Sequence, residues 1–263
     1  MNPKKLLRMK DALPILDSFE SEPSSDLSVS KIPRILYQYW DSSPPEQVLV
    51  LLDRNRQLCE LNGISYRLFT DVLARDFLRD NCSRNILEAY EIAPHPAMKS
   101  DVFRVAILAA YGGFYLDADM VLRDSFVELY AIPGDLAVFR WESHNRRNIC
   151  SWLVGSAPAS LPITFLRDAM AHSISWACLR DPNAALIHSL AVAGPGVMTK
   201  GVASFLKYGR QEGYSKRANI TIRSVEYAYQ HYLQNGPNYL KSRLAYKETG
   251  LHWLVASKNE ATQ

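Results

Sequence analysis

The chain has 263 residues, a length that fits one or two domains and suffices for a single α/β unit with a sizeable core. Apolar residues make up 48% of the chain and charged residues 22%, which excludes a mainly disordered or collagen-like protein. With 30 basic and 27 acidic residues the net charge is only +3, so nucleic acid is not an expected partner.

The features that indicate a cellular compartment favour the cytoplasm. No stretch reaches the roughly 18 consecutive apolar residues of a membrane-spanning helix, and the N-terminal residues lack the apolar core and cleavage site of a secretory signal. The cysteines form no CxxC pair, so we expect reduced, mostly buried thiols at Cys59, Cys82, Cys150 and Cys178. Residues 1–16 combine basic and leucine-rich positions, which is typical either of a helix in peripheral contact with a membrane or of a packed terminal helix.

The order of the predicted elements indicates an α/β fold. The polar, Ser-rich residues 20–30 predict a linker, so we divide the chain into an N-terminal helix and linker, 1–30, and a folded body, 31–263. Periodicity predicts strands at 32–39, 64–69, 114–117 and 136–141, and helices at 46–63, 71–80, 84–92, 101–111, 162–180 and 196–208. Their alternation favours a single domain with a mostly parallel central sheet and helices on both faces.

The helix at 101–111 is the clearest of these elements, with Ser100 as its predicted N-cap and Gly112-Gly113 as its stop. Asp101 and Arg104 lie three positions apart on this helix and therefore share a face. They fit either a simple ion pair or a carboxylate that binds sugar hydroxyls and is held by a guanidinium, and the residues alone leave both open.

Two acids, Asp117 and Asp119, follow the predicted strand at 114–117, where ligands bind in open α/β sheets. On an extended strand, residues i and i+2 point the same way, so their charges repel unless a cation lies between them. Hard oxygen ligands suit Mg²⁺ or Mn²⁺, which usually share their remaining positions with substrate phosphates. The alternative is a solvated turn, because about one D-x-D triplet is expected by chance in a chain of this composition.

Residues 96–119 resemble a known family. Pro96–Arg104 (PAMKSDVFR) followed by Tyr111–Asp119 (YGGFYLDAD) resembles the central motif of the D-x-D glycosyltransferases of family 32, which are similar to yeast initiating mannosyltransferases, capsule and lipopolysaccharide sugar transferases and the glucosylating domain of clostridial toxins. Three flanking segments resemble further family motifs in the same order: Ile32–Trp40, Ala193–Pro195 and Leu251–Trp253. The resemblance implies a GT-A fold, which is a Rossmann-like nucleotide-sugar-binding domain.

The resemblance also implies a donor site. Trp40 would stack on the nucleotide base, with packing at a strand end as the alternative. Ser100 and Asp101 would lie near the ribose and donor sugar, and Asp101 and Arg104 would hold donor-sugar hydroxyls. Tyr115 would contact the diphosphate or sugar, or serve as a core tyrosine.

The metal and phosphate contacts are implied in the same way. Asp117 would bind ribose and a metal-bound water, Asp119 would ligate Mn²⁺ or Mg²⁺ directly, and His252 would be a further ligand or a strand histidine without one. Three more positions would complete the donor site, namely Gly194 through close backbone approach, and Ser257 and Lys258 at the phosphates. The C-terminal motif departs from the family pattern because Leu251 replaces a histidine and the terminal tryptophan is missing or replaced by Lys258.

These inferences combine into a metal-dependent, retaining glycosyltransferase with Asp101, Arg104, Asp117 and Asp119 as its catalytic residues. It would move a hexose from a nucleoside-diphosphate sugar, with UDP favoured, to a saccharide, a lipid-linked saccharide or another hydroxyl acceptor, in surface polysaccharide synthesis. Residues 140–190 would form the acceptor half. The alternatives are a catalytically impaired nucleotide-sugar-binding module, a toxin-like protein glycosyltransferase, and a metal-dependent nucleotidyl or phosphoryl transferase, although no P-loop motif is present.

Overall fold

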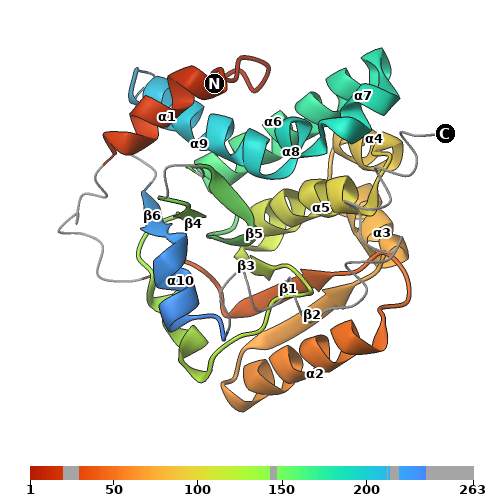
Figure 1. The fold of residues 1–263 in the computed structure, drawn as a ribbon, viewed down its shortest axis with the longest axis vertical. Helices are drawn as coiled ribbons and strands as arrows, with labels where there is room; N and C mark the ends of the chain where they lie inside the picture. Colours follow the sequence, from red (N-terminus) through yellow and green to blue (C-terminus); the bar gives the residue numbers. More distant parts are fainter. Residues whose placement is uncertain (20–29, 143–146, 212, 214–218, 235–263) are drawn as a thin grey trace.

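A computed structural model describes residues 1–19, 30–142, 147–211, 213 and 219–234. These residues build a central six-stranded sheet with the strand order β2-β1-β3-β5-β4-β6 (Figure 1). The strands are β1 (Ile35–Tyr39), β2 (Ser65–Phe69), β3 (Gly113–Leu116), β4 (Leu136–Arg140), β5 (Ile149–Ser156) and β6 (Ile220–Ser224). Only β5 runs antiparallel to its neighbours within this sheet. The expected mostly parallel α/β sheet is thus confirmed, and the carboxyl ends of the other strands share one edge.

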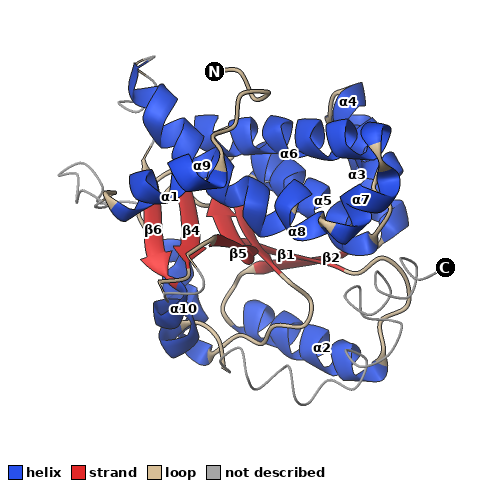
Figure 2. Cartoon of the chain, turned by 45° about the horizontal axis from the view of Figure 1, so that its top comes forward, coloured by secondary structure: helices blue, strands red, loops and turns tan. Residues whose placement is uncertain are grey.

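Helices cover both faces of the sheet, as Figure 2 shows. The larger layer contains α1 (Met9–Asp17), α3 (Asp71–Asn81), α4 (Arg84–Ile92), α5 (Pro96–Tyr111), α6 (Leu161–Arg180), α7 (Pro182–Ile187), α8 (Ser189–Val192) and α9 (Gly194–Gln211). The opposite face carries α2 (Glu46–Leu61), the 3₁₀ helix η1 (Asp124–Ala131) and α10 (Val225–His231).

Successive strand residues supply the two cores on opposite faces. Tyr37 and Tyr115 belong to the cluster beneath α5, α6 and α9, whereas their neighbours Leu36 and Phe114 belong to the cluster beneath α2 and η1. This alternation follows from the two-residue repeat of a strand. Because both faces are covered, β1 and β3 consist almost entirely of buried residues.

The N-terminal helix packs onto the body of the protein. Leu7, Ala12 and Leu16 are buried in the larger core, and the Leu7 N–H donates to Ser204 Oγ on α9 at 2.9 Å. These contacts favour the packed terminal helix over a membrane-surface helix, and membrane contact through residues 1–16 stays a prediction. In the part of the chain that the structure describes, no helix is long and apolar enough to cross a bilayer.

Several sequence expectations need correction. Ser100 is not an N-cap, because α5 begins one turn earlier at Pro96, and the His95 side chain caps it by accepting from the Ala97 N–H at 3.2 Å. Proline at the first helical position is favourable because its fixed φ suits the helix and its missing N–H needs no partner there. The strands β5 and β6 were not predicted. The expectation of free, mostly buried cysteines is confirmed.

Candidate functional site

The two acids of the D-x-D motif lie in a turn at the carboxyl edge of the sheet. Strand β3 ends at Leu116, and the turn is closed by a hydrogen bond from the Met120 N–H to the Asp117 carbonyl at 3.1 Å. The Asp117 N–H still donates to Trp152 on β5 at 2.9 Å, which fixes where the turn begins. A turn, rather than the alternation of an extended strand, therefore sets the relative directions of Asp117 and Asp119.

Arg104 is the charged centre of the site. Its Nη2 lies 3.1 Å from Asp101 Oδ1 and 3.2 Å from Asp117 Oδ1, and its guanidinium stacks over the Tyr115 ring at 4.5 Å. The guanidinium also donates to the carbonyl of Ser151 on β5. Burial by itself would lower the Arg104 pKa, but Asp117 and Asp101 outweigh burial and raise it. Arg104 is thus a permanently charged bridge between α5, β5 and the acidic turn.

Asp101 is buried beside this bridge. Burial raises the pKa of Asp101 to about 6, with Asp117 adding to the rise, while Arg104 and the backbone N–H of Gly194 act against it. Gly194 adopts a positive φ of 42°, and a Cβ there would lie 2.9 Å from Asp101 Oδ2. The close backbone approach expected at Gly194 is therefore made to the Asp101 carboxylate within this structure.

Ser100 and Tyr115 form a second buried pair next to Arg104. Their hydroxyl oxygens lie 2.6 Å apart, and Ser100 Oγ also accepts from Arg104 Nη2 at 3.0 Å. Burial raises the pKa of Tyr115, so its hydroxyl remains protonated. The structure thus brings together Ser100, Asp101, Arg104, Tyr115 and Asp117, and the first four are buried, which makes them supports of the site more than open contact points.

The described residues allow a test of the metal assignment. No group of three or more His, Cys, Asp or Glu side chains converges anywhere among them. Asp117 already pairs with Arg104 and keeps about one-third of its side chain exposed, whereas Asp119 lies further along the turn. Two carboxylates nevertheless suffice for Mg²⁺ or Mn²⁺ when phosphates and water supply the remaining oxygens. The donor set fits such an ion, and the role of Asp119 as its direct ligand stays a prediction.

Trp40 lies at the same edge, directly after β1. Its side chain is half-buried and packs against the core beneath α2. The next residue, Asp41, lines a cavity of about 410 Å³. The other polar residues of this cavity are Asp71, Glu91, His95 and Lys99. An open space therefore adjoins the segment that contains Trp40.

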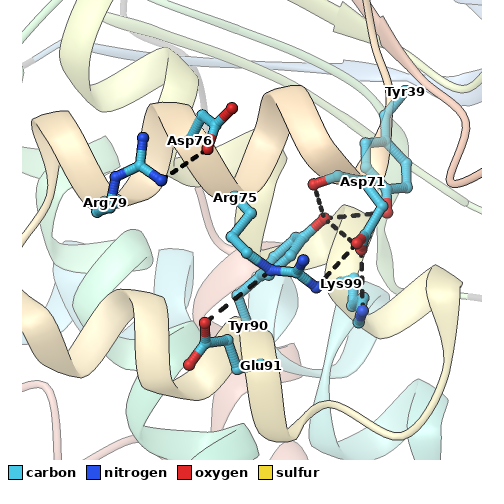
Figure 3. Close-up of polar contacts among 8 residues, drawn as sticks. All are labelled: Tyr39, Asp71, Arg75, Asp76, Arg79, Tyr90, Glu91 and Lys99. Carbon is cyan, nitrogen blue, oxygen red and sulfur yellow. Dashed lines mark hydrogen bonds and ion pairs between the residues drawn. The ribbon is translucent and has the colours of Figure 1, made fainter.

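Figure 3 shows how the wall of this cavity is held. Asp71 Oδ1 accepts hydrogen bonds from Lys99 Nζ at 2.9 Å and from the Tyr90 hydroxyl at 3.0 Å, while Asp71 Oδ2 pairs with Arg75 at 2.9 Å. The Tyr90 hydroxyl also lies 3.1 Å from that of Tyr39 on β1. These contacts connect α3, α4 and α5 to the end of β1, immediately before Trp40.

Sequence reasoning missed two buried amides behind the acidic turn. Gln38 on β1 and Asn55 on α2 are both fully buried and hydrogen-bond to the backbone of the turn. A glutamine inside an otherwise apolar strand was the available signal, because buried polar groups need partners. The proposed ligands His252, Ser257 and Lys258 lie outside the described residues.

The segment that contains the acidic turn is similar to segments of known proteins. A sequence family described as "Glycosyltransferase sugar-binding region containing DXD motif" matches residues 34–135. The chain is 29% identical over 132 residues to an uncharacterised glycosyltransferase of Acanthamoeba polyphaga mimivirus, covering 48% of this chain and 51% of that protein. It is 31% identical over 107 residues to inositol phosphoceramide mannosyltransferase 1 of Schizosaccharomyces pombe, covering 40% of this chain and 33% of that protein.

The fold comparison extends further along the chain. The solved structure of the PaToxG glycosyltransferase superposes with a TM-score of 0.51 at 12% identity, and the match covers 95% of this chain and 96% of that one. At this identity the likeness supports the fold alone, and it agrees with the expected GT-A architecture. Residues 34–135 are thus similar to the DXD sugar-binding region of glycosyltransferases, and the fold is similar to that of a solved glycosyltransferase.

Proposed function

We propose that the protein is a metal-dependent, retaining glycosyltransferase that moves a hexose from a nucleoside-diphosphate sugar to a hydroxyl acceptor. The observation that carries this proposal is the buried Asp101–Arg104–Asp117 arrangement directly behind the acidic turn. Burying a guanidinium between two carboxylates serves little purpose for stability alone, because the desolvation penalty offsets most of the attraction. It does fix charges at the sheet edge, where ligands of α/β folds bind.

Each residue of the arrangement has a role that follows from its contacts. Asp119, assisted by Asp117, would hold Mn²⁺ or Mg²⁺, which when bound neutralises charge on the leaving diphosphate. Arg104 holds Asp101 and Asp117 in place and adds positive charge to a water-poor region, where it acts more strongly than in bulk water. In our sequence prediction Asp101 would accept hydrogen bonds from donor-sugar hydroxyls, and its buried ion pair with Arg104 would keep its carboxylate in place. Catalysis would thus rest on positioning and electrostatics more than on a protein nucleophile.

The nucleotide would lie on the Trp40 side of the site. A tryptophan face stacks on any base, and the neighbouring cavity beyond Asp41 offers space for one. UDP remains the favoured nucleotide of our sequence prediction. The names of several relatives specify mannosyl transfer, which supports testing a GDP-linked mannose donor beside UDP-linked hexoses.

The acceptor and its setting extend this proposal. A saccharide or a lipid-linked saccharide in surface polysaccharide synthesis is the favoured acceptor, and a location in the cytoplasm with peripheral membrane contact through residues 1–16 would suit it. A protein acceptor is the alternative. The chain spans only about half, or less, of the curated relatives it matches, so their activities do not transfer as they stand.

The testing experiment measures hydrolysis of UDP-glucose, UDP-galactose and GDP-mannose with added Mn²⁺, then after EDTA. We expect slow release of free sugar from one donor and its loss with EDTA. Asp119→Asn should abolish release and leave the melting temperature nearly unchanged, whereas Asp124→Asn, at an exposed acid in the same segment, should preserve it. Metal-dependent nucleotide binding without sugar release would identify a catalytically impaired nucleotide-sugar-binding module. Release of pyrophosphate would identify a nucleotidyl transferase. Full turnover in Asp119→Asn would contradict its metal role.

A further inference from the structure

The acidic turn is held from behind by two amide side chains that belong to other elements. Gln38 Nε2 on β1 donates to the Asp117 carbonyl at 3.1 Å. Asn55 on α2 donates from Nδ2 to the Met120 carbonyl at 2.8 Å, and its Oδ1 accepts from the Leu122 N–H at 3.0 Å. The backbone from 117 to 122 is therefore fixed at both ends, with Asp119 between the anchors.

The two amides also hold each other. Asn55 Nδ2 lies 3.3 Å from Gln38 Oε1, which in addition accepts from the Tyr66 hydroxyl at 3.0 Å. Neither amide side chain is exposed to solvent. A buried network of satisfied amides resists deformation, because moving any member leaves a buried polar group without a partner. The turn is thus rigid before any ligand arrives.

Such a scaffold is more than the chain connection requires. A turn between a strand and the following segment needs only the single backbone hydrogen bond that closes it, from Met120 to Asp117. Here two further elements each contribute a fully buried side chain to the same six residues. Direction matters most at this point, because oxygen ligands of a small divalent cation tolerate little displacement.

We propose that Gln38 and Asn55 are positioning residues that hold Asp119 in the direction needed to bind a divalent cation together with a nucleoside diphosphate. This inference rests on the proposed function. Neither amide touches the ion or the substrate. They act through the backbone of the turn, as outer-shell partners act on metal ligands, where their loss typically lowers metal affinity by 10–100-fold, so we expect about that effect here.

The test uses Asn55→Leu and Gln38→Met, which keep approximate size and remove the hydrogen bonds. Ser156→Ala is the matched control, since Ser156 on β5 is also fully buried and hydrogen-bonded. It pairs with Gly113 at the start of β3, whereas the acidic turn follows the end of β3. Two quantities are measured on each variant and on the unmodified protein. One is amide hydrogen exchange at Met120 and Leu122 without metal, and the other is the Mn²⁺ concentration that gives half-maximal binding of UDP or GDP.

We expect faster amide exchange at Leu122 in Asn55→Leu, because the substitution removes the acceptor of its N–H. Half-maximal nucleotide binding should require roughly 10–100-fold more Mn²⁺ in both variants. Ser156→Ala should lower the melting temperature and leave both quantities unchanged. Unchanged half-saturation in folded variants would overturn the inference, and if Asn55→Leu does not fold, Gln38→Met decides. If the unmodified protein binds neither nucleotide in a Mn²⁺-dependent way, the proposed function is wrong, and the exchange rates alone decide whether the amides fix the turn.

Discussion

Replacing Arg104 by methionine should reveal how strongly the buried charge arrangement holds the site together. The substitution keeps an unbranched apolar stem and removes the guanidinium that joins Asp101, Asp117 and the Ser151 carbonyl. Removing one partner of a buried ion pair typically destabilises by about 3–5 kcal/mol, because the remaining charge stays buried without compensation. For a chain of this size that corresponds to a fall in melting temperature of roughly 6–20 °C.

The pH dependence of this loss identifies its cause. The folded-state pKa of Asp101 is already raised to about 6, above the unfolded value near 4, so ionising Asp101 weakens the fold as pH rises between these values. Arg104 acts against this rise, so its removal raises the folded pKa further and extends the loss to higher pH. The deficit of Arg104→Met should therefore be larger at pH 8 than at pH 5.

Calorimetric or circular-dichroism melts test this reasoning on the unmodified protein, Arg104→Met, a double variant and a control. The double variant Arg104→Met with Asp101→Asn should recover part of the stability and flatten the pH dependence. Arg56→Met removes an exposed pair with Asp53 and Glu60, and it should change the melting temperature far less than Arg104→Met does. An Arg104→Met deficit that equals that of Arg56→Met, or that neither varies with pH nor responds to Asp101→Asn, would refute the argument.

Three further substitutions probe the surroundings of the site. Gly194→Ala should lower stability and sugar-nucleotide turnover, since its methyl would lie 2.9 Å from a carboxylate oxygen. The control Gly63→Ala, at a positive φ but in open space, should show only the backbone strain of about 1–2 kcal/mol. Equal melting temperatures of the two variants would contradict this reasoning. Burial alone would raise the pKa of Asp71, but the hydrogen bonds from Lys99 and Tyr90 outweigh burial and lower it, so the stabilisation is present above about pH 4 and is lost as the pH falls through the lowered pKa. The melting deficit of Asp71→Asn at pH 7 should accordingly shrink as the pH falls below about 4, and a constant deficit would argue against the charge. Trp40→Ala should weaken UDP binding, measured by calorimetry, by about 1–3 kcal/mol, and unchanged affinity would mean that Trp40 only packs.

Local sequence patterns predicted most of the α/β frame. The helix α2, between Pro45 and Gly63, and the strand after it are set by residues close in the chain, through proline and glycine signals and apolar periodicity. By contrast, the sequence patterns did not predict β5 and β6. The run Ile149–Ser156 is buried on both faces and mixes small polar residues with apolar ones, so it lacks the alternation by which a half-buried strand is recognised.

The helix start at Pro96 shows a different limit of local patterns. Serine before an apolar run is a common N-cap, and Ser100 satisfied that pattern. The competing signal was a proline at the first helical position preceded by a histidine that caps through its ring nitrogen. This start carries the helix one turn further, so Ser100 lies inside α5, where its hydroxyl reaches Tyr115 and Arg104.

At the site itself, Asp101, Arg104 and Asp117 lie close together as the sequence predicted, but the two acids of D-x-D are not equivalent in the fold. In D-x-D the two acids look equivalent, and an extended strand would aim them alike. In the structure β3 ends before them, and Asp117 turns to Arg104 while Asp119 lies further along the turn. That division follows from tertiary pairing, because the Arg104 position depends on α5 crossing β3 and on a carbonyl of β5. The ion pair with Arg104 distinguishes Asp117, and Asp119 as the direct metal ligand stays a prediction. The chemical difference between two identical side chains is thus produced by a residue that lies more than ten positions away in the chain.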